Sequence, residues 1–292
     1  MKIALSTDTS CGISKKLATE LNIKVFPLNV IIDGEEFLDG LSINQDELLI
    51  AMKSNKKIKT STPPPGVVID YFEKLFKEGY DLIIHFTISS KLSSMNSLFN
   101  EISKNNFENK IIVIDSFSVC SSMLSQLLYT YEALQDNLDI ETIKKELEKR
   151  KDDSQIYFIP ENLTALKNGG RISPAVAALC NLIGIKPVLH FSDGALEKDT
   201  VTKNLKKYLH ERIEELVKSY SLDNYDYTIA SFSADQTLLD FTINEIKLHQ
   251  NVDVTIVPVP INVCAHCGPG TLGLIVSKKL NKKSLHKYLE IK

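Results

Sequence analysis

The chain has 292 residues, of which 43% are hydrophobic and 24% are charged, a composition typical of a folded protein. Disorder is therefore excluded as its main state. The 34 basic and 37 acidic side chains give a formal charge of -3, so no overall positive field attracts a polyanion, and we exclude nucleic acid as a partner. The length suits two domains or one large domain.

The five cysteines and the amino terminus indicate a reducing compartment. Cys11, Cys120, Cys180, Cys264 and Cys267 are scattered and odd in number, which is unlike a disulfide scaffold. The apolar run that follows Lys2 is far shorter than the core of a signal peptide or a membrane span. We therefore expect a cytoplasmic protein.

Predicted strands and helices alternate along the first half of the chain. Strands are predicted at 2–7, 23–32, 82–87 and 111–115, and helices at 13–21, 44–52, 67–77, 93–102 and through Leu134. Asp33-Gly34 predicts a tight hairpin turn, and three prolines stiffen the 60–66 loop. Such alternation favours a parallel sheet covered by helices, with ligands at the carboxyl ends of its strands.

The second half mixes hairpin and crossover connections. A charged amphipathic helix is predicted at 140–151 and leads into this half. Its charges are most simply explained as a face exposed to solvent. Strands are predicted at 154–159, 185–191, 195–201, 227–232, 252–258 and 272–276, and helices at 174–182, 203–220 and 235–249.

The segment Gly169-Gly170-Arg171 is the most informative one. Two glycines free the backbone just before a helix start, where Ser173 and Pro174 suit the cap and the first turn. Arginine is rare in this lysine-rich chain, and its rigid fork binds carboxylates and phosphates. The alternative is a structural ion pair that pins the loop.

A cysteine pair flanks His266 in Cys264-Ala265-His266-Cys267-Gly268-Pro269-Gly270, which we interpret as a compact loop. The pair supplies two zinc ligands of the usual four, and no second pair completes a tetrahedral set. A redox or metal-regulated module at Cys264 and Cys267 is kept as one alternative function.

Ser93 lies where a helix follows a strand, in the serine-rich segment 88–94. The simplest interpretation is that a serine here caps the helix. The functional alternative is that the hydroxyls and the helix amides bind an anion at the positive end of the helix dipole. The chain has no GxSxG, GxGxxG or GxxxxGK[ST] motif, which counts against an esterase, a dinucleotide enzyme and a P-loop kinase.

Seven short motifs, in order over nearly the whole chain, resemble those of the DegV family of bacterial fatty-acid-binding proteins. They are Thr7-Asp8-Thr9-Ser10, Thr60-Ser61-Thr62-Pro63, Ser89-Ser90-Lys91-Leu92-Ser93, Asp115-Ser116, Gly169-Gly170-Arg171-Ile172-Ser173, Ile185-Lys186-Pro187 and His266-Cys267-Gly268-Pro269-Gly270. The resemblance implies a two-domain α/β fold. Residues 1–155 would form a three-layer α/β/α domain on a parallel sheet, and residues 156–292 a two-layer α/β domain on a mixed sheet.

The resemblance also implies the ligand and the site. One long-chain fatty acid would lie in a buried tunnel between the domains, and no cofactor is expected. Thr60 or Ser61, which the sequence does not separate, and Ser93 would bind its carboxylate, with Arg171 and His266 around the mouth. The protein would be a non-catalytic carrier that presents the carboxylate to a fatty-acid kinase, which makes acyl phosphate for phospholipid synthesis.

The sequence departs from the family pattern after Ser93, where Ser94-Met95 replaces the usual glycine and threonine. Met95 is bulky and flexible, and we expect it to line the pocket and alter its shape. A second alternative function is an acyl-ester hydrolase with Ser93 as nucleophile, His266 as base and Asp8 or Asp115 as orienting group. We expect a monomer whose membrane contact, if any, is transient.

Overall fold

A four-stranded parallel sheet forms the centre of the amino-terminal lobe. The structure is a computed structural model that describes residues 1–181, 184–250 and 252–291. The strand order is β2 (Lys24–Phe26), β1 (Ile3–Asp8), β6 (Leu82–Thr87) and β7 (Ile111–Asp115). β1 and β6 are buried almost throughout, as expected of central parallel strands covered on both faces.

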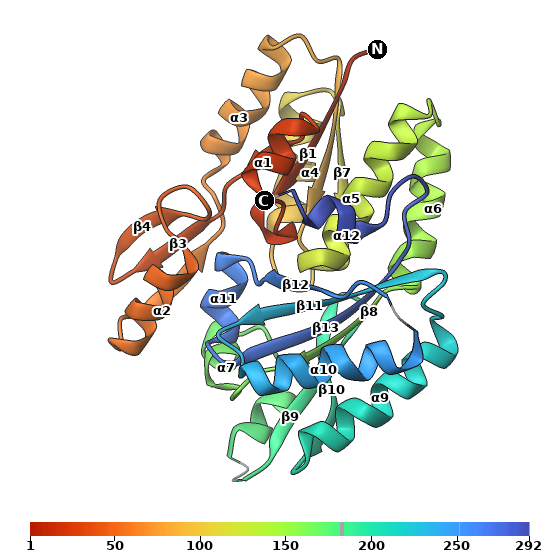
Figure 1. Cartoon of the computed structure of the whole chain (residues 1–292). Helices are drawn as coiled ribbons and strands as arrows, with labels where there is room; N and C mark the ends of the chain where they lie inside the picture. The colour runs from red at the N-terminus through yellow and green to blue at the C-terminus, as the bar shows by residue number, and fades with distance from the viewer. Residues whose placement is uncertain (182–183, 251, 292) are drawn as a thin grey trace.

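Helices cover both faces of this sheet and make three layers (Figure 1). On one face lie α3 (Pro65–Lys77) and α4 (Met95–Asn106). On the other face lie α1 (Lys15–Glu20), α5 (Cys120–Gln135), α6 (Ile140–Asp152) and, from the far end of the chain, α12 (Leu285–Leu289). We call this lobe, with α12, the amino-terminal lobe.

A small antiparallel sheet projects from the amino-terminal lobe. It consists of β4 (Glu35–Leu38), β3 (Asn29–Ile32) and β5 (Ile58–Ser61), and α2 (Gln45–Lys53) lies beside it. Asp33 and Gly34 both have positive φ, which confirms the predicted hairpin turn. The prediction of one strand at 23–32 is wrong, because β2 joins the parallel sheet and β3 joins this one. The sequence analysis predicted no strand at the position of β5.

A six-stranded mixed sheet forms the carboxyl-terminal lobe, which spans residues 155–278. Its order is β10 (Ala195–Thr202), β9 (Lys186–Ser192), β8 (Gln155–Ile159), β13 (Thr271–Lys278), β11 (Tyr225–Phe232) and β12 (Thr255–Pro258), and only β11 and β12 pair in parallel. α9 (Leu205–Ser219) and α10 (Gln236–His249) cover one face. The opposite face turns toward the amino-terminal lobe. The predicted fold class is confirmed, while the boundary after residue 155 stays a prediction.

Short helices appear where the sequence indicated loops or longer elements. The segment predicted as a loop around His266 is largely helical, in α11 (Ile261–Cys267), which begins after Pro260 and ends at Gly268. α7 (Thr164–Gly169) was not predicted. The helix predicted at 174–182 is α8 (Pro174–Ala177) followed by a 3-10 turn, Ala178–Asn181, and position 182 lies outside the described residues. β12 is shorter than the predicted strand at 252–258.

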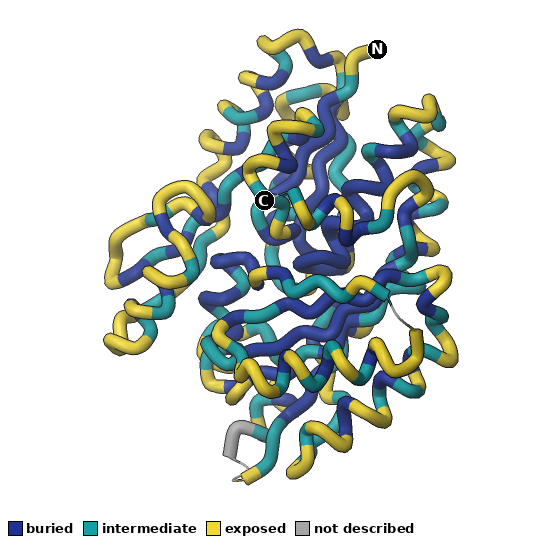
Figure 2. The backbone as a smooth tube through the Cα atoms, viewed as in Figure 1, coloured by how far each residue is buried: buried dark blue, intermediate teal, exposed yellow. Residues whose placement is uncertain are grey.

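The chain passes between the lobes twice, at two adjacent places. It leaves the amino-terminal lobe after α6 and returns after β13, so that α12 packs with α5. Arg150, which is 4% exposed, holds the two passages together: its Nη1 and Nη2 donate to the carbonyls of Lys278 and Lys279 at 3.0 and 3.1 Å. We call the boundary between the two lobes the seam. Figure 2 shows the deeply buried strands of the two lobes on either side of it.

In the described part of the chain, no helix combines the length and the apolar character that crossing a membrane requires.

Candidate functional site

A cavity of about 150 Å³ lies between the two lobes. Loops of the amino-terminal lobe line one side, and α11 and the open face of the mixed sheet line the other. The residues that line it are Leu28, Asn29, Thr60, Ser61, Thr62, Ile88, Leu92, Ser93, Met95, Val119, Cys120, Ile156, Phe158, Leu166, Arg171, Phe191, Leu196, Ala230, Val259, Asn262, Val263, His266, Cys267, Gly273 and Ile275.

The apolar end of the cavity is built on the mixed sheet. Ile156 and Phe158 are two residues apart on β8 and therefore point to the same face. Gly273 on β13 pairs with Ala230 on β11, and a Cβ at Gly273 would lie 3.4 Å from that of Ala230. This small pair leaves the room that larger side chains would fill.

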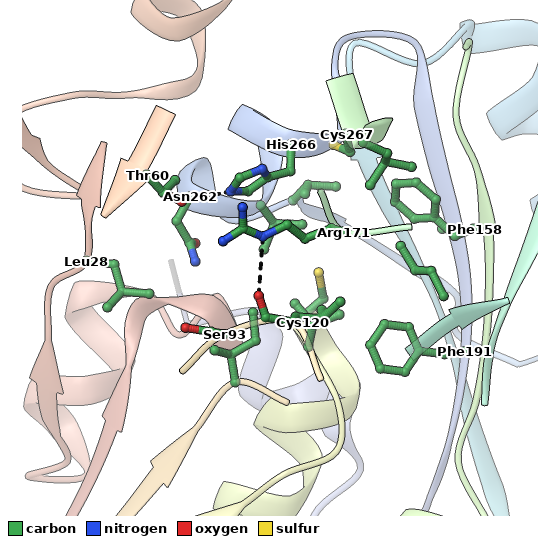
Figure 3. Close-up of a pocket in the computed structure, with 18 of the residues that line it drawn as sticks. Leu28, Thr60, Ser93, Cys120, Phe158, Arg171, Phe191, Asn262, His266 and Cys267 are labelled. Carbon is green, nitrogen blue, oxygen red and sulfur yellow. Dashed lines mark hydrogen bonds between the residues drawn. The ribbon is translucent and has the colours of Figure 1, made fainter. Parts of the chain in front are cut away.

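Polar side chains gather at the other end of the cavity, away from Phe158 and Phe191 (Figure 3). The residues that the resemblance implied for the carboxylate and the mouth all line the cavity: Thr60, Ser61, Ser93, Arg171 and His266. Among the described residues that line the cavity, Arg171 is the only charged one, and none is acidic. The cavity therefore suits an amphiphile with one negative charge.

His266 is held in place from two sides. Its Nε2 lies 2.8 Å from Oγ1 of Thr60, which joins α11 to β5. On its other side the ring packs against the backbone of Gly169, where any Cβ would overlap Nδ1. Burial, together with the charge of Arg171, lowers the pKa of His266 to about 4. The ring is therefore neutral at pH 7.

Arg171 reaches across the seam between the lobes. Gly170, in the left-handed conformation with φ 69°, ends α7 and turns the chain toward it. Nε of Arg171 donates to the carbonyl of Leu92 at 3.3 Å, and Nη1 donates to the carbonyl of Gly169. Burial lowers the pKa of its guanidinium. The predicted alternative, an ion pair with an acidic side chain, is absent from the described part of the chain.

Ser93, just before α4, lines the cavity, whereas Ser94, the cap residue of α4, makes no side-chain bond to the helix. Oγ of Ser93 accepts a hydrogen bond from the amide of Met95 at 3.3 Å, and Ser94 lies 3.0 Å from Oγ1 of Thr62. Met95 is 2% exposed and lines the cavity, where the sequence analysis expected it.

Asn262 also lines the cavity, and the sequence analysis did not include it. It is 5% exposed and lies in the first turn of α11. Its amide nitrogens bind the other lobe, because Nδ2 donates to Ser10 at 2.7 Å and its backbone N donates to Asp39 at 3.1 Å. Its Oδ1 has no hydrogen-bond partner within the described residues. In the sequence Asn262 stands between Ile261 and Val263 and belongs to no recognised motif, so nothing indicated that it lines the cavity.

The structure does not assemble the hydrolase triad that was considered as an alternative. Within the described chain no hydrogen bond joins Ser93 to His266, whose Nε2 bonds Thr60 instead. Both carboxylates proposed as orienting groups bind backbone amides: Asp8 binds those of Ser10 and Ile88, and Asp115 those of Ser90 and Phe117.

The cysteines near the cavity are buried thiols. Cys11, Cys120, Cys264 and Cys267 are all free. Burial raises the pKa of Cys264, whose Sγ donates to the carbonyl of Val259 at 3.2 Å, and this disfavours a reactive thiolate. In the ranges that the structure describes, no three His, Cys, Asp or Glu side chains are grouped to hold a metal ion.

The fold and the cavity together define a two-lobed α/β protein with a cavity between its lobes. The model of the DegV family, described as uncharacterised proteins, matches residues 2–279, and the chain belongs to this family.

Relatives of known sequence and structure resemble the chain over most of its length. A DegV domain-containing protein of Staphylococcus aureus is 29% identical over 282 residues, 95% of this chain and 99% of that protein. One of Listeria innocua is 31% identical over 220 residues, 74% of this chain and 77% of its own. DegV of Bacillus subtilis, a fatty acid binding protein, has a TM-score of 0.84 and 26% identity over 96% of this chain and 100% of its own. A fatty acid binding DegV family protein of Streptococcus agalactiae shares the fold, with a TM-score of 0.86 and 23% identity over 96% of this chain and 99% of its own.

Proposed function

We propose that this protein binds one long-chain fatty acid in the cavity between its lobes, with the carboxylate at the polar end. The observation that carries the proposal is the lining, in which Arg171 is the only charge among the described residues, hydroxyls cluster near it, and the far end is apolar. The Bacillus subtilis relative, named a fatty acid binding protein, supports it.

The two ends of the cavity would contribute different things to binding. A tail of about fifteen methylenes, at roughly 0.8 kcal/mol each, gives an upper bound near 12 kcal/mol of transfer free energy. The carboxylate loses water on entry, and hydroxyl donors with a nearby cation offset that loss. The tail therefore dominates affinity and the polar end sets orientation.

Ligand entry would change the polar end. We propose that the carboxylate accepts hydrogen bonds from Ser93 and from Thr60 or Ser61, with Arg171 and His266 at the mouth. Thr60 now bonds His266, so the carboxylate would take over one partner of that pair. The cavity of about 150 Å³ is also smaller than the roughly 300 Å³ or more of sites for drug-sized ligands, so a long tail requires the lobes or side chains to give way.

The carrier role is the second part of the proposal. The protein would catalyse no reaction itself and would present the carboxylate to a fatty-acid kinase for acyl-phosphate formation. The position of Arg171 and His266 at the polar end, next to the seam, supports this, because a kinase needs the head group within reach while the tail stays covered.

The test is extraction of purified protein with organic solvent, followed by mass spectrometry and binding measurements on the delipidated protein. We expect one fatty acid per chain. Arg171→Gln should weaken binding roughly tenfold to hundredfold, the value of one charge-assisted hydrogen bond. Ser93→Ala should weaken it less, and Ser97→Ala, on the exposed face of α4, should bind as the parent does.

Two outcomes would contradict the proposal. A parent protein that carries no lipid and takes none up would overturn fatty-acid binding. Release of free acid from a labelled acyl ester, lost in Ser93→Ala, would replace the carrier with a hydrolase. Addition of a fatty-acid kinase and ATP to the loaded protein should yield acyl phosphate, and the yield should fall more than lipid retention in the Ser93 and Arg171 variants.

A further inference from the structure

A second cavity, of about 330 Å³, lies directly behind the apolar end of the first one. The two cavities share Ile156 and Phe191 as lining residues. Ile156 is 4% exposed and Phe191 9% exposed, so both side chains stand between the cavities as a buried wall. In Figure 3, Phe191 lies at the end of the first cavity away from Ser93 and Thr60.

The second cavity differs from the first in chemistry. Its lining is mainly polar and includes Ser118, Gln126, Ser154 and Lys151. Ser118 and Gln126 are 3% and 2% exposed, yet Oγ of Ser118 and Oε1 of Gln126 have no hydrogen-bond partner within the described chain. Because the lining of this cavity is mainly polar, a bare hydrocarbon that displaced water from it would leave polar groups without partners, which is unfavourable.

The strand that carries Phe191 is fixed against the amino-terminal lobe. The turn that follows β9 packs so closely on the other lobe that a Cβ at Gly194 would lie 2.5 Å from Oγ of Ser89. That hydroxyl donates to the carbonyl of Gly194 at 2.6 Å. Phe191 also pairs with Leu196 across the hairpin. The wall therefore stands on a clamped hairpin and not on a free loop.

We propose that Phe191, backed by Ile156, ends the acyl cavity and sets the longest unsubstituted chain that the protein accepts. This inference rests on the proposed fatty-acid binding. Acids short enough to stop at the wall gain roughly fourfold in affinity with each methylene, and longer ones gain nothing because the next space is polar. Removal of the ring joins the cavities, so a chain with a hydroxyl at its far end could then form hydrogen bonds with the polar lining of the second cavity.

The experiment measures dissociation constants of delipidated protein for saturated acids from decanoic to eicosanoic acid and for ω-hydroxyhexadecanoic acid. In Phe191→Ala the length at which affinity stops rising should increase by two methylenes or more, which makes the longer acids roughly tenfold tighter than in the parent. The variant should also bind the ω-hydroxy acid better, relative to hexadecanoic acid, than the parent does.

Phe158→Ala is the matched control, because Phe158 lines only the first cavity of the two. It removes the same volume from the apolar end but leaves the wall, so it should move the length limit clearly less than Phe191→Ala does. Phe191→Leu, which perturbs packing less, gives a smaller shift in the same direction and replaces Phe191→Ala if that variant does not fold.

The outcomes distinguish a failure of the Phe191 inference from a failure of the proposed fatty-acid binding. If the parent binds acids but its length limit is unchanged in both Phe191 variants, or moves equally in Phe158→Ala, the wall is not Phe191. If neither the parent nor any variant binds a fatty acid, the proposed function fails and this inference fails with it.

Discussion

Position 169 requires a glycine because the His266 ring packs against it, and not because its backbone has a positive φ. A methyl group there would overlap Nδ1 of His266, whereas Gly170 has open space but a left-handed φ of 69°. Gly169→Ala should therefore push the His266 ring away from Thr60 and disturb the polar end of the cavity, which should weaken fatty-acid binding by roughly tenfold.

Gly170→Ala is its control, since the strain of a left-handed alanine should lower the free energy of unfolding by about 1 kcal/mol without altering affinity. Chemical denaturation and lipid titration of both variants separate the two effects. Equal loss of affinity in the two would show that the loop, and not the His266 ring, is what the glycines protect.

The pKa of His266 predicts a pH effect on stability. Folding lowers this pKa from 6.5 to about 4, so between these values the unfolded chain binds the proton and the folded chain does not. His266 thus contributes stability that is lost as pH falls from about 6.5 to about 4. His266→Gln should show a shallower loss of unfolding free energy over that window, measured by urea titration, and a difference from the parent that is constant with pH would contradict this.

The sequence drew attention to several residues that line the cavity, but it did not indicate their partners. Arg171 and His266 stood out because a lone arginine follows two glycines and a histidine lies between two cysteines. The motif could not show that the first glycine exists to accommodate the histidine almost one hundred residues away, since that fact belongs to packing. Asn262 carried no motif at all, and its bonds to Ser10 and Asp39 are long-range.

At the scale of elements, strong periodicity was a reliable guide and short segments were not. The central strands β1 and β6 were predicted within about one residue, because fully buried parallel strands are continuous apolar runs. α11 is seven residues long, too short to display a helical period, and its flanking proline and glycine resembled a loop. β5 carries lysine and threonine and is a strand only because β3 pairs with it.

A cap that was recognised from the sequence allows an element-scale prediction. Ser173 begins α8 and its Oγ accepts from the amide of Val176 at 3.3 Å, with Pro174 in the first turn as expected. Ser173→Ala should lower the free energy of unfolding by about 1 kcal/mol. Ser173→Asp, which restores the acceptor, should recover most of the loss in the same denaturation experiment; no recovery would mean that the cap is not what Ser173 provides.

For the whole molecule, the joint between the lobes depends on Arg150. Its guanidinium donates to two carbonyls and stacks on Tyr129 at 4.1 Å. Lysine keeps the charge but cannot make the paired contact. Arg150→Lys should lower the free energy of unfolding by about 2 kcal/mol. Lys149→Ala, one residue away and exposed, should stay within about 0.5 kcal/mol of the parent. Equal stability of the two variants would remove Arg150 from this role.

The double passage of the chain restricts how the pocket can open. A single connecting segment would act as a swivel and let one half turn freely against the other. Two adjacent segments linked by one guanidinium act as a hinge that resists rotation of one lobe against the other. We therefore expect the lobes to separate at the edge where Thr60 and Arg171 lie, and not to twist. A lipid would then enter and leave only along that edge, head group last in and first out.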